Sequence, residues 1–587
     1  MRQFFITVLG VVFGIFAFFF VLFAILAVFG IFGGIKESMK PAEQNVLTID
    51  MRLPMIDHDG SSGNLFGATP PSIVTTARAL RRAKTDDNIK GLFIRAESFG
   101  MAPASAEELR LAILDFKESG KFVIAHAQGF EATSIIPYQA VTASDEIWMQ
   151  DTTGFAISGL RSEAEFFGGV FDKIEAQPQF EQFYEYKNAA NTYIQTGFTD
   201  AHKEATTSYM TSIYDNAMAQ IADDRDIPLP QLKALLNASP HSAEAAKDAN
   251  LVDKLGHIEE AREYAKEKAG GDSVKFKTVQ DYGISTKVTG DAIAFIGGQG
   301  PVITGESSTG SPFNPSLSMG GDTIAAAFDA ATKDKAVKAI VFRVSTPGGS
   351  PAASDQILAA ADRAKEAGKP VIISMGQYAA SGGYYVSAHA DHIVAMPQTI
   401  TGSIGVLGGK IAFEDSFAKI GYNIEGITIG GDYAGAYSVD EPFNQGQRAA
   451  YRGQLEDIYE DFTMRVANGR NLPLSKVKEI AKGRVWTGEQ AKEIGLVDEL
   501  GGFFTAVDAA KRFAKIEDDA KVRIKVFPRP KSTAEQFEEL FNGSAQIHAD
   551  MAALREIAEL PEVRAALKAR QASRIGQEMT ADIPDIQ

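Results

Sequence analysis

Ser381 is the residue whose type and setting point most directly to chemistry. It lies in the motif YAASGGYY at 378–385, shortly after an apolar run at 371–374. A serine at a strand-to-helix turn, flanked by small residues, is accessible as a nucleophile, and a helix N-terminus stabilises an anion beside it. Serine is also a preferred helix N-cap, and the residue type alone favours that role. The motif is not a G-x-S-x-G nucleophile elbow, because Ala379 replaces the first glycine.

Two consecutive glycines, Gly348 and Gly349, follow another apolar run that ends at Val344. Glycines directly after a strand let the backbone turn tightly and expose N–H groups. A second glycine cluster at 297–305 lacks both the G-x-G-x-x-G and the Walker-A spacing, so no nucleotide cofactor is predicted. The chain has no cysteine, which excludes a thiol nucleophile, a thiolate metal site and a disulfide scaffold.

Histidines after Ser381 suggest two other kinds of site. His389 and Asp391 could complete a Ser-His-Asp arrangement. However, Asp391 is matched by Asp145 in an earlier part of the chain that lacks the serine motif, which indicates a structural role. His389 and His392 could bind a metal ion, but no third ligand is near them in the sequence. No metal site is predicted.

Short strands and helices must position these residues. Residues 339–343 (AIVFR) and 370–374 (PVIIS) have the composition of buried strands, and the alanine-rich stretch 354–367 between them has that of a helix. Strand–helix alternation of this kind is typical of parallel βαβ units. The sequence therefore predicts an α/β fold.

The chain also contains an internal repeat. Residues 88–95 (NIKGLFIR) resemble 336–343 (AVKAIVFR), 248 positions later. Residues 251–256 (LVDKLG) resemble 496–501 (LVDELG), 245 positions later. Such ordered matches with a slowly drifting offset are typical of a duplicated domain that has lost a few loop residues.

Four parts are predicted from the repeat and from local composition. The two copies cover 45–281 and 290–530, each of a size usual for one α/β domain. Residues 4–33 are uncharged and apolar, and at about 1.5 Å per residue they form a helix long enough to span a bilayer. A cleavable signal peptide, the alternative, has a shorter apolar region. Residues 531–587 are charged and helix-favouring, which predicts a helical extension.

The overall charge limits the class of partner. The 58 Lys and Arg residues are outnumbered by 75 Asp and Glu, which gives a net charge of −17. This balance argues against nucleic acid or an anionic lipid surface as the main partner. A hydrophobic content of 45% excludes intrinsic disorder as the main state.

Several motifs in a fixed order resemble the signal peptide peptidase A family, also called protease IV. They are YAASGGYY at 378–385, TGSIG at 401–405, RVWTG at 484–488 and GLVD at 495–498. The resemblance extends to about residue 530, with Thr346 as a mild departure in the glycine loop. It implies duplicated Clp/crotonase-like domains, a Ser/Lys dyad and no cofactor.

The resemblance assigns the serine to the second copy and the lysine to the first. Ser381 lies in the serine motif, and Lys187 lies in a matching lysine motif, EYKNAANTY at 185–193. An offset of 248 places Thr133 opposite Ser381, and alignment of the neighbouring tyrosines places Ala434 opposite Lys187. Each copy thus keeps one member of the dyad and lacks the other.

The chemistry of a Ser/Lys pair sets conditions on Lys187. A serine hydroxyl needs a base, and lysine serves as one only when it is neutral. Its usual pKa is about 10.4, and burial away from carboxylates lowers this toward roughly 7. The resemblance makes Ser403 the hydrogen-bond partner of the lysine, although a simple turn serine is the alternative. Candidate oxyanion donors are the N–H groups of Gly349 and Gly382, with Gly348 shaping the turn.

The expected function is that of a membrane-anchored serine endopeptidase that degrades signal peptide remnants and other short, apolar, unfolded peptides. The resemblance implies a single-pass protein of a bacterial inner membrane, with a periplasmic body that forms a homotetramer. Whether Ser381 and Lys187 meet within one chain is open, although the long form of the family suggests that they do. Alternatives are crotonase-like acyl-CoA hydratase or isomerase chemistry and a non-catalytic membrane-anchored scaffold.

Overall fold

The computed structural model describes residues 44–59, 71–96, 100–284, 290–308, 316–517 and 519–529. The anchor predicted at 4–33 and the extension predicted at 531–587 lie outside these ranges. Within them, no helix combines the length and the apolar character that crossing a bilayer requires.

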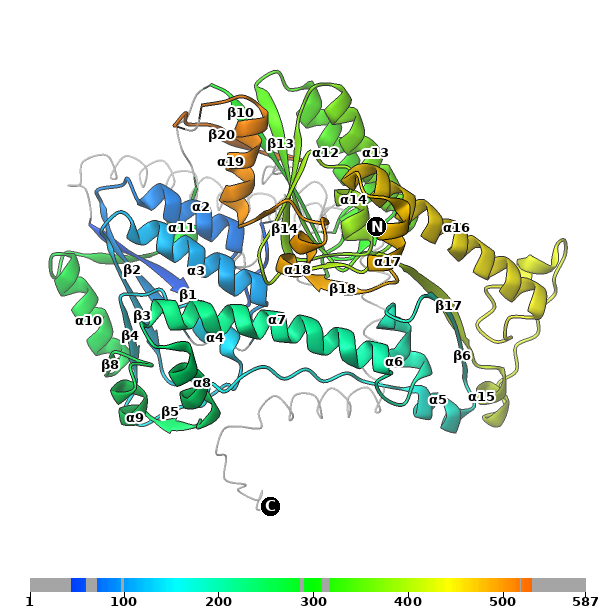
Figure 1. The fold of residues 1–587 in the computed structure, drawn as a ribbon, viewed down its shortest axis with the longest axis horizontal. Helices are drawn as coiled ribbons and strands as arrows, with labels where there is room; N and C mark the ends of the chain where they lie inside the picture. The colour runs from blue at the N-terminus through cyan, green and yellow to red at the C-terminus, as the bar shows by residue number, and fades with distance from the viewer. Residues whose placement is uncertain are drawn as a thin grey trace, which may run out of the picture.

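Six parallel strands form the first sheet, in the order β8-β4-β3-β2-β1-β9 (Figure 1). The strands of this half are β1 (Asn45–Asp50), β2 (Ile89–Arg95), β3 (Phe122–Ala127), β4 (Glu146–Met149), β5 (Gly154–Phe155), β6 (Gln177–Phe183), β7 (His241–Ser242), β8 (Lys254–Leu255) and β9 (Lys275–Thr278). Its helices are α2 (Ile73–Ala83), α3 (Pro103–Lys117), α4 (Ile135–Gln139), α5 (Gly168–Ile174), α6 (Asn191–Ile194), α7 (Asp200–Asp224), α8 (Leu229–Asn237), α9 (Ala243–Asp248), α10 (Ile258–Ala269) and α11 (Val279–Tyr282), with a 3₁₀ turn, η2 (Asn188–Ala190).

Successive apolar side chains of a strand point to opposite faces of this sheet, and helices pack on both faces. Leu47 and Ile49 of β1 pack in the cluster that contains Leu80 of α2 and Ile113 of α3. Val46, which points to the opposite face, packs in a second cluster with the alanines of α10. Strands buried on both faces explain why the sequence shows continuous apolar runs rather than strict alternation with polar residues.

The second sheet has a parallel core in the order β19-β15-β14-β13-β10-β20, and β16 and β18 extend a branch from β14. The strands of this half are β10 (Ala292–Gln299), β11 (Val302–Ile303), β12 (Met319–Gly320), β13 (Val337–Thr346), β14 (Val371–Ala380), β15 (His392–Ala395), β16 (Ile400–Gly402), β17 (Val406–Ala412), β18 (Val485–Thr487), β19 (Glu499–Leu500) and β20 (Arg523–Phe527). Its helices are α12 (Gly321–Lys333), α13 (Pro351–Glu366), α14 (Gly382–Ser387), α15 (Glu414–Lys419), α16 (Gln445–Arg470), α17 (Leu474–Ile480), α18 (Gly488–Glu493) and α19 (Phe503–Phe513), with a 3₁₀ turn, η3 (Asp432–Gly435).

The predicted α/β class with parallel sheets is confirmed, and the strands near the candidate site are longer than predicted. β13 and β14 each have ten residues, and β14 continues to Ala380, directly before Ser381. Helices cover both faces of this sheet too: Ala294 of β10 packs with the cluster of α12 and α13, and Phe295 packs against α19. Ser381 and the glycines at 348–349 therefore follow long, largely buried strands.

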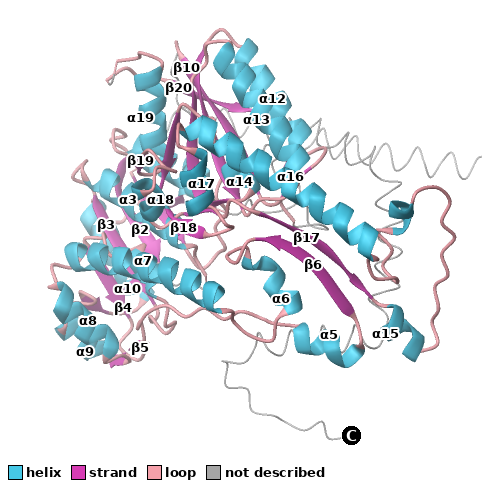
Figure 2. Cartoon of the chain, turned by 45° about the vertical axis from the view of Figure 1, so that its right-hand side comes forward, coloured by secondary structure: helices cyan, strands magenta, loops and turns pink. Residues whose placement is uncertain are grey.

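A two-stranded ribbon joins the two halves of the chain. β6 from the first half pairs antiparallel with β17 from the second, with Phe183 opposite Val406 and Gln177 opposite Ala412. Figure 2 shows this ribbon extending away from both sheets, beside α16. Because the end of β6 lies beside the start of β17, segments more than two hundred residues apart in sequence meet at this point.

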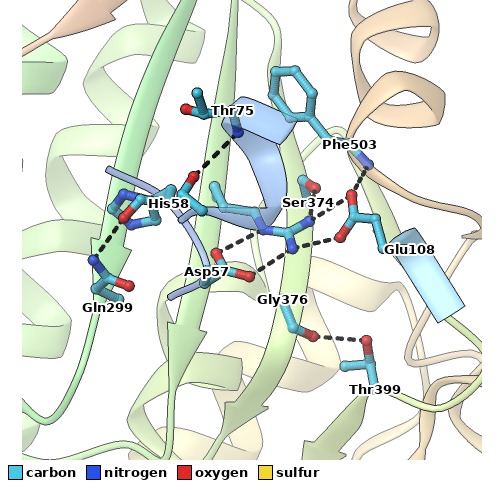
Figure 3. A network of polar contacts seen from close by, with 11 residues as sticks. Asp57, His58, Thr75, Glu108, Gln299, Ser374, Gly376, Thr399 and Phe503 are labelled. Carbon is cyan, nitrogen blue, oxygen red and sulfur yellow. Dashed lines mark hydrogen bonds and ion pairs between the residues drawn. The ribbon is translucent and has the colours of Figure 1, made fainter. Parts of the chain in front are cut away.

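A buried ion cluster also connects the halves. The Arg343 guanidinium on β13 donates hydrogen bonds to Asp57 (2.6 and 2.9 Å) and to Glu108 on α3 (2.6 Å). Glu108 also accepts the N–H of Phe503, the first residue of α19, at 2.6 Å. Figure 3 shows Asp57 and Glu108 converging on the guanidinium, with Ser374 beside it. The Arg343 side chain is 1% exposed, so its charge depends on these partners.

Replacement of Arg343 by methionine is expected to lower the free energy of unfolding by about 3–5 kcal/mol, because two carboxylates would remain buried without a counter-charge. Urea denaturation measures this loss. The control is Arg363→Met, which breaks a half-exposed pair with Asp329 and is expected to cost about 1 kcal/mol or less. Equal losses in the two variants would show that the cluster does not hold the halves together.

Candidate active site

Ser381 occupies the turn between β14 and α14. Its backbone has φ 54° and ψ −117°, a conformation that L-residues rarely adopt. Its N–H donates to the Gly402 carbonyl oxygen at 2.9 Å. The residue stands at the N-cap position of α14, but its side chain makes no capping hydrogen bond. The hydroxyl is therefore not used as a cap, which was the alternative raised by the sequence.

Lys187 directly precedes η2 and reaches Ser381 within the same chain. Its Nζ lies 3.1 Å from the Ser381 Oγ, and it donates to the Oγ and the carbonyl oxygen of Ser403 at 3.0 and 2.9 Å. Ala434, its counterpart in the sequence alignment, lies in η3 and is exposed. The structure thus brings three of the predicted site residues together around one amine.

Burial changes the acid–base character of this amine. The Lys187 residue is 6% exposed, and desolvation lowers the pKa of Lys187 to about 7. No described carboxylate opposes this shift, because its hydrogen-bond partners are two hydroxyls and a carbonyl oxygen. A lysine in this setting is partly neutral near physiological pH and has a free lone pair to accept a proton.

The ribbon of β6 and β17 explains how Lys187 and Ser403 meet. Lys187 follows the end of β6 by four residues, and Ser403 precedes the start of β17 by three. Antiparallel pairing places these two ends side by side. Glu181 on β6 fixes the ribbon to α16 through ion pairs with Arg448 (2.6 Å) and Arg452 (2.7 Å).

Strand pairing also explains the position of Ser403 beside Ser381. β16 runs parallel to β14, with Gly402 opposite Ala380, so the residue after each strand lies at the same edge. Ser403 has φ 49°, and its N–H donates to the Arg484 carbonyl oxygen at 2.7 Å. This backbone contact fixes the turn, while the hydroxyl and the carbonyl of Ser403 are directed at the lysine.

The three predicted glycines lie around Ser381. Gly348 has φ 105°, and a Cβ there would come within 2.7 Å of the Ser381 Cβ, so only glycine fits. Gly349 and Gly382 line the same cavity as Ser381 and Lys187. Among the described residues, the amide N–H groups of Gly349 and Gly382 have no hydrogen-bond acceptor. These two donors are free to hold a developing negative charge.

The cavity at Ser381 has a volume of about 420 Å³, which is large enough for a side chain and adjoining backbone of a peptide. One wall carries the polar residues described above. Much of the rest is apolar and includes Val406, Leu407, Ile458, Phe462 and Val485, with the ring of Tyr385.

Sequence reasoning missed two glycines that allow the halves to meet. Gly483 has φ 79°, and a Cβ there would lie 2.5 Å from the Lys187 Cβ and 2.6 Å from its backbone N and Cα. Gly405 packs against Gly483 in turn, since its own Cβ would lie 2.8 Å from the Gly483 Cα. The signal was present, because Gly405 closes the TGSIG motif and Gly483 directly precedes RVWTG.

Replacement of Gly483 by alanine is expected to displace Lys187 from Ser381, and in an enzyme that uses a Ser/Lys pair a shift of about 1 Å lowers kcat by about 10²-fold. Steady-state kinetics measure it. The control is Gly453→Ala in α16, where a Cβ meets nothing within 4 Å and activity should be unchanged. Wild-type activity in Gly483→Ala would contradict the close packing of these segments.

The structure corrects one predicted alignment. Ile135, and not Thr133, repeats the backbone contact of Ser381: its N–H donates to the carbonyl oxygen of a following segment at 3.0 Å. Tyr138 and Tyr384, each three residues further along, donate to carbonyl oxygens at 2.6 and 2.8 Å. The two tyrosines are 246 positions apart in the sequence. The offset of 248, which was taken from the preceding strands, is therefore wrong at Ser381.

The histidines lie apart from the candidate nucleophile. The His389 Nδ1 lies 2.9 Å from the Asp362 carboxylate, and Asp391 accepts the N–H of the first residue of β14 at 2.8 Å. The structural role predicted for Asp391 is therefore confirmed. The His392 Nε2 lies 2.9 Å from a glutamate on β19. Within the described part of the chain, no group of three possible metal ligands is present.

Comparison with known proteins places this chain in a family. The model of peptidase family S49 matches residues 115–272 and again 363–517, more than half of the chain. Protease 4 of Salmonella typhi is 32% identical over 477 residues, which cover 77% of this chain and 74% of that protein. The chloroplastic serine protease SPPA of Arabidopsis thaliana is 29% identical, over 83% of this chain and 72% of that protein.

A further relative, protease 4 of Haemophilus influenzae, is 30% identical over 76% of this chain and 73% of its own length. These matches favour a peptidase over the acyl-CoA and scaffold alternatives, and they span both halves of the chain. The chain belongs to peptidase family S49 and is a serine peptidase.

Proposed function

We propose that Ser381 is the nucleophile and Lys187 its general base, acting within one chain. The observation that carries this proposal is the 3.1 Å separation of the Lys187 Nζ and the Ser381 Oγ, in a setting that lowers the pKa of Lys187 to about 7. A neutral lysine at this distance accepts the hydroxyl proton as the oxygen attacks a peptide carbonyl. The protonated amine then donates to the leaving nitrogen and frees the first product.

The surrounding groups support the remaining steps. Ser403 holds the Lys187 amine through its hydroxyl and carbonyl oxygen, which keeps the lone pair aimed at Ser381. The N–H groups of Gly349 and Gly382 stabilise the oxyanion of the tetrahedral intermediate, because both glycines line the cavity and their N–H groups have no acceptor among the described residues. Water, activated by the same lysine, then hydrolyses the acyl-enzyme.

The substrates that we propose are cleaved signal peptides and other short, apolar, unfolded peptides. The apolar wall formed by residues such as Leu407, Ile458 and Phe462 supports an apolar side chain next to the bond that is cut. Ser381 lines this cavity and is only partly exposed, so an extended peptide reaches it more readily than the backbone of a folded domain.

We further propose that residues 4–33 anchor the protein once in a bacterial inner membrane, with the body in the periplasm. The length and composition of this run support the anchor, and the orientation follows the family resemblance. The same resemblance suggests a homotetramer. Exposed isoleucines after α15, Ile420, Ile427 and Ile429, support an interface between copies, since single chains rarely expose such groups together.

The two halves are proposed to be duplicated Clp/crotonase-like domains at 45–281 and 290–530. The corresponding strand orders, β9-β1-β2-β3-β4-β8 and β20-β10-β13-β14-β15-β19, support this origin. The two separate matches to the family model support it as well. In this arrangement the first domain contributes Lys187 and the second contributes Ser381, so neither is active alone.

Peptide digestion tests the proposed substrate class. The full chain is incubated with an apolar peptide of signal-peptide composition, a polar peptide of equal length and a folded domain, and the products are identified by mass spectrometry. Cleavage should be fastest within the apolar peptide and absent from the folded domain. Preferential cleavage of the polar peptide would contradict the proposed specificity while leaving the Ser381–Lys187 pair untouched.

A further inference from the structure

A second cavity, larger than the one at Ser381, lies at the seam between the two halves. It has a volume of about 760 Å³ and is bordered by α2 from the first half and by α19 and β20 from the second. It shares no lining residue with the cavity at Ser381. This volume is within the usual range for a small-molecule site.

The lining of this cavity is strongly basic, on a chain whose net charge is −17. It includes three arginines of α2 and two lysines, against one carboxylate: Arg78, Arg81, Arg82, Lys511, Lys521 and Asp508. Low-dielectric walls with charges of one sign concentrate the field and attract counter-ions. The ligand that fits this lining is an anion.

Arg78 gives the strongest indication of a missing partner. It makes no hydrogen bond or ion pair with any residue that the structure describes, and desolvation lowers the pKa of Arg78 to about 10. Asp59 attracts it only through space, and the Asp59 carboxylate accepts a hydrogen bond from the Thr75 hydroxyl. Arg78 is only partly exposed, and cations that are largely desolvated in proteins are normally paired, because desolvation disfavours the charge. An anion in the cavity would supply the pair.

The neighbouring arginines are held in place before any ligand binds. The Arg82 guanidinium lies 4.2 Å from the centre of the Tyr282 ring and donates to the carbonyl oxygens of Tyr282 (2.9 Å) and Gly283 (3.1 Å). Among the described carboxylates, Asp86 acts on it through space, without a hydrogen bond or an ion pair. The Arg81 guanidinium stacks at 4.0 Å over the ring of Phe504 and is partly neutralised by an aspartate of α3 at 3.3 Å. Such preorganised guanidinium groups bind planar or tetrahedral anions well.

The remaining lining is mostly apolar, so a ligand that fills the cavity would carry an apolar part as well as a negative charge. Beside the basic residues, the cavity is bordered by Ile284, Phe504, Val507, Val522 and Ile524. We propose that it binds an anionic amphiphile, with a phosphate or carboxylate head at Arg78 and Arg82 and a hydrocarbon part against Phe504, Val507 and Ile524. The proposal does not depend on the peptidase mechanism.

Calorimetric titration of the full chain with hexyl phosphate tests this site. Hexyl phosphate should bind about tenfold or more tightly than inorganic phosphate, which has the head alone, and hexanol, which has the chain alone, should not bind. Hexanoate distinguishes a carboxylate head from a phosphate. Absence of hexyl phosphate binding, or equal binding of hexanol, would overturn the proposal.

Two variants place the binding in this cavity. Arg78→Gln removes the unpaired cation, and Lys521→Glu adds a negative charge at an exposed position of the lining, where the substitution should leave folding unchanged. Each should weaken hexyl phosphate binding about tenfold or more. The control is Arg161→Gln, which changes an arginine that is 81% exposed elsewhere on the surface and should leave binding unchanged. Wild-type affinity in Lys521→Glu and in Arg78→Gln would overturn the assignment.

Discussion

Replacing Ser381 by alanine is expected to lower kcat/KM for peptide hydrolysis by about 10⁴-fold or more, with little change in stability. The activity falls because the hydroxyl 3.1 Å from the Lys187 Nζ is the proposed attacking group. Stability changes little because the Ser381 side chain makes no capping hydrogen bond to α14. Steady-state kinetics and thermal unfolding of the same preparation separate the two effects.

Ser134→Ala is the matched control, because Ser134 lies at the corresponding strand-to-helix turn of the first half. Its hydroxyl does cap a helix, accepting the Ile136 N–H at 3.4 Å. This variant should lose about 1 kcal/mol or less of stability and keep its activity. If Ser381→Ala retained a tenth or more of wild-type activity, Ser381 would not be the nucleophile.

Replacing Lys187 by methionine is expected to lower kcat by about 10³-fold or more, because the apolar side chain fills the site but accepts no proton. The pH dependence gives a second readout. Wild-type activity should rise with a midpoint near pH 7 as the Lys187 amine loses its proton. Lys187→Arg, whose guanidinium stays charged, should be inactive throughout this range. A wild-type midpoint near pH 5 would indicate a carboxylate base instead.

Replacing Lys187 by methionine should also make the protein more stable below pH 7. The pKa of Lys187 falls from 10.5 when unfolded to about 7 when folded, so between these values the unfolded state binds more protons. Wild-type stability therefore rises with pH from about 7 to 10.5, and below pH 7 the full cost of the buried amine remains. Lys187→Met removes this cost but also the bonds to Ser403, for a net gain of about 1–3 kcal/mol.

Urea denaturation at pH 6 and pH 9 measures this gain, which should shrink at the higher pH. The control is Lys482→Met, at a lysine that is 40% exposed and paired with Glu185 at the surface. It should change stability by less than about 1 kcal/mol at either pH. A gain in Lys187→Met that grew with pH would contradict a lowered pKa. This trade of stability for activity is common at catalytic groups.

Much of the fold could be predicted from composition and spacing, as could the part of the candidate site that follows buried strands, whereas Lys187 and Ser403 were predicted only from the family resemblance. Apolar runs of strand length alternating with helical stretches predicted parallel sheets, because strands buried on both faces need no polar positions. Ser381 and the glycines at 348–349 were identified because they follow such strands directly. At Ser381 the sequence left cap and nucleophile open, and only the absence of a capping bond in the structure separates them.

Lys187 could not be found from spacing, since it lies 194 residues before Ser381 and outside any regular pattern. Its position depends on the pairing of β6 with β17, a long-range contact that single-sequence patterns do not specify. The same holds for Arg343, whose partners Asp57 and Glu108 belong to no motif. Thr133 was wrongly aligned with Ser381 because a loop deletion changes the offset between the two copies within a few residues.

The central claim is that a neutral Lys187 activates Ser381, and the rate of Ser381 acylation tests it most directly. A serine-directed acylating probe is applied across pH 5–9, and the modified residue is identified by mass spectrometry. We expect labelling at Ser381 with a rate that rises around pH 7 and falls by about 10³-fold or more in Lys187→Met. Labelling of Ser381 in Lys187→Met at the wild-type rate, or labelling of a different serine, would contradict the account.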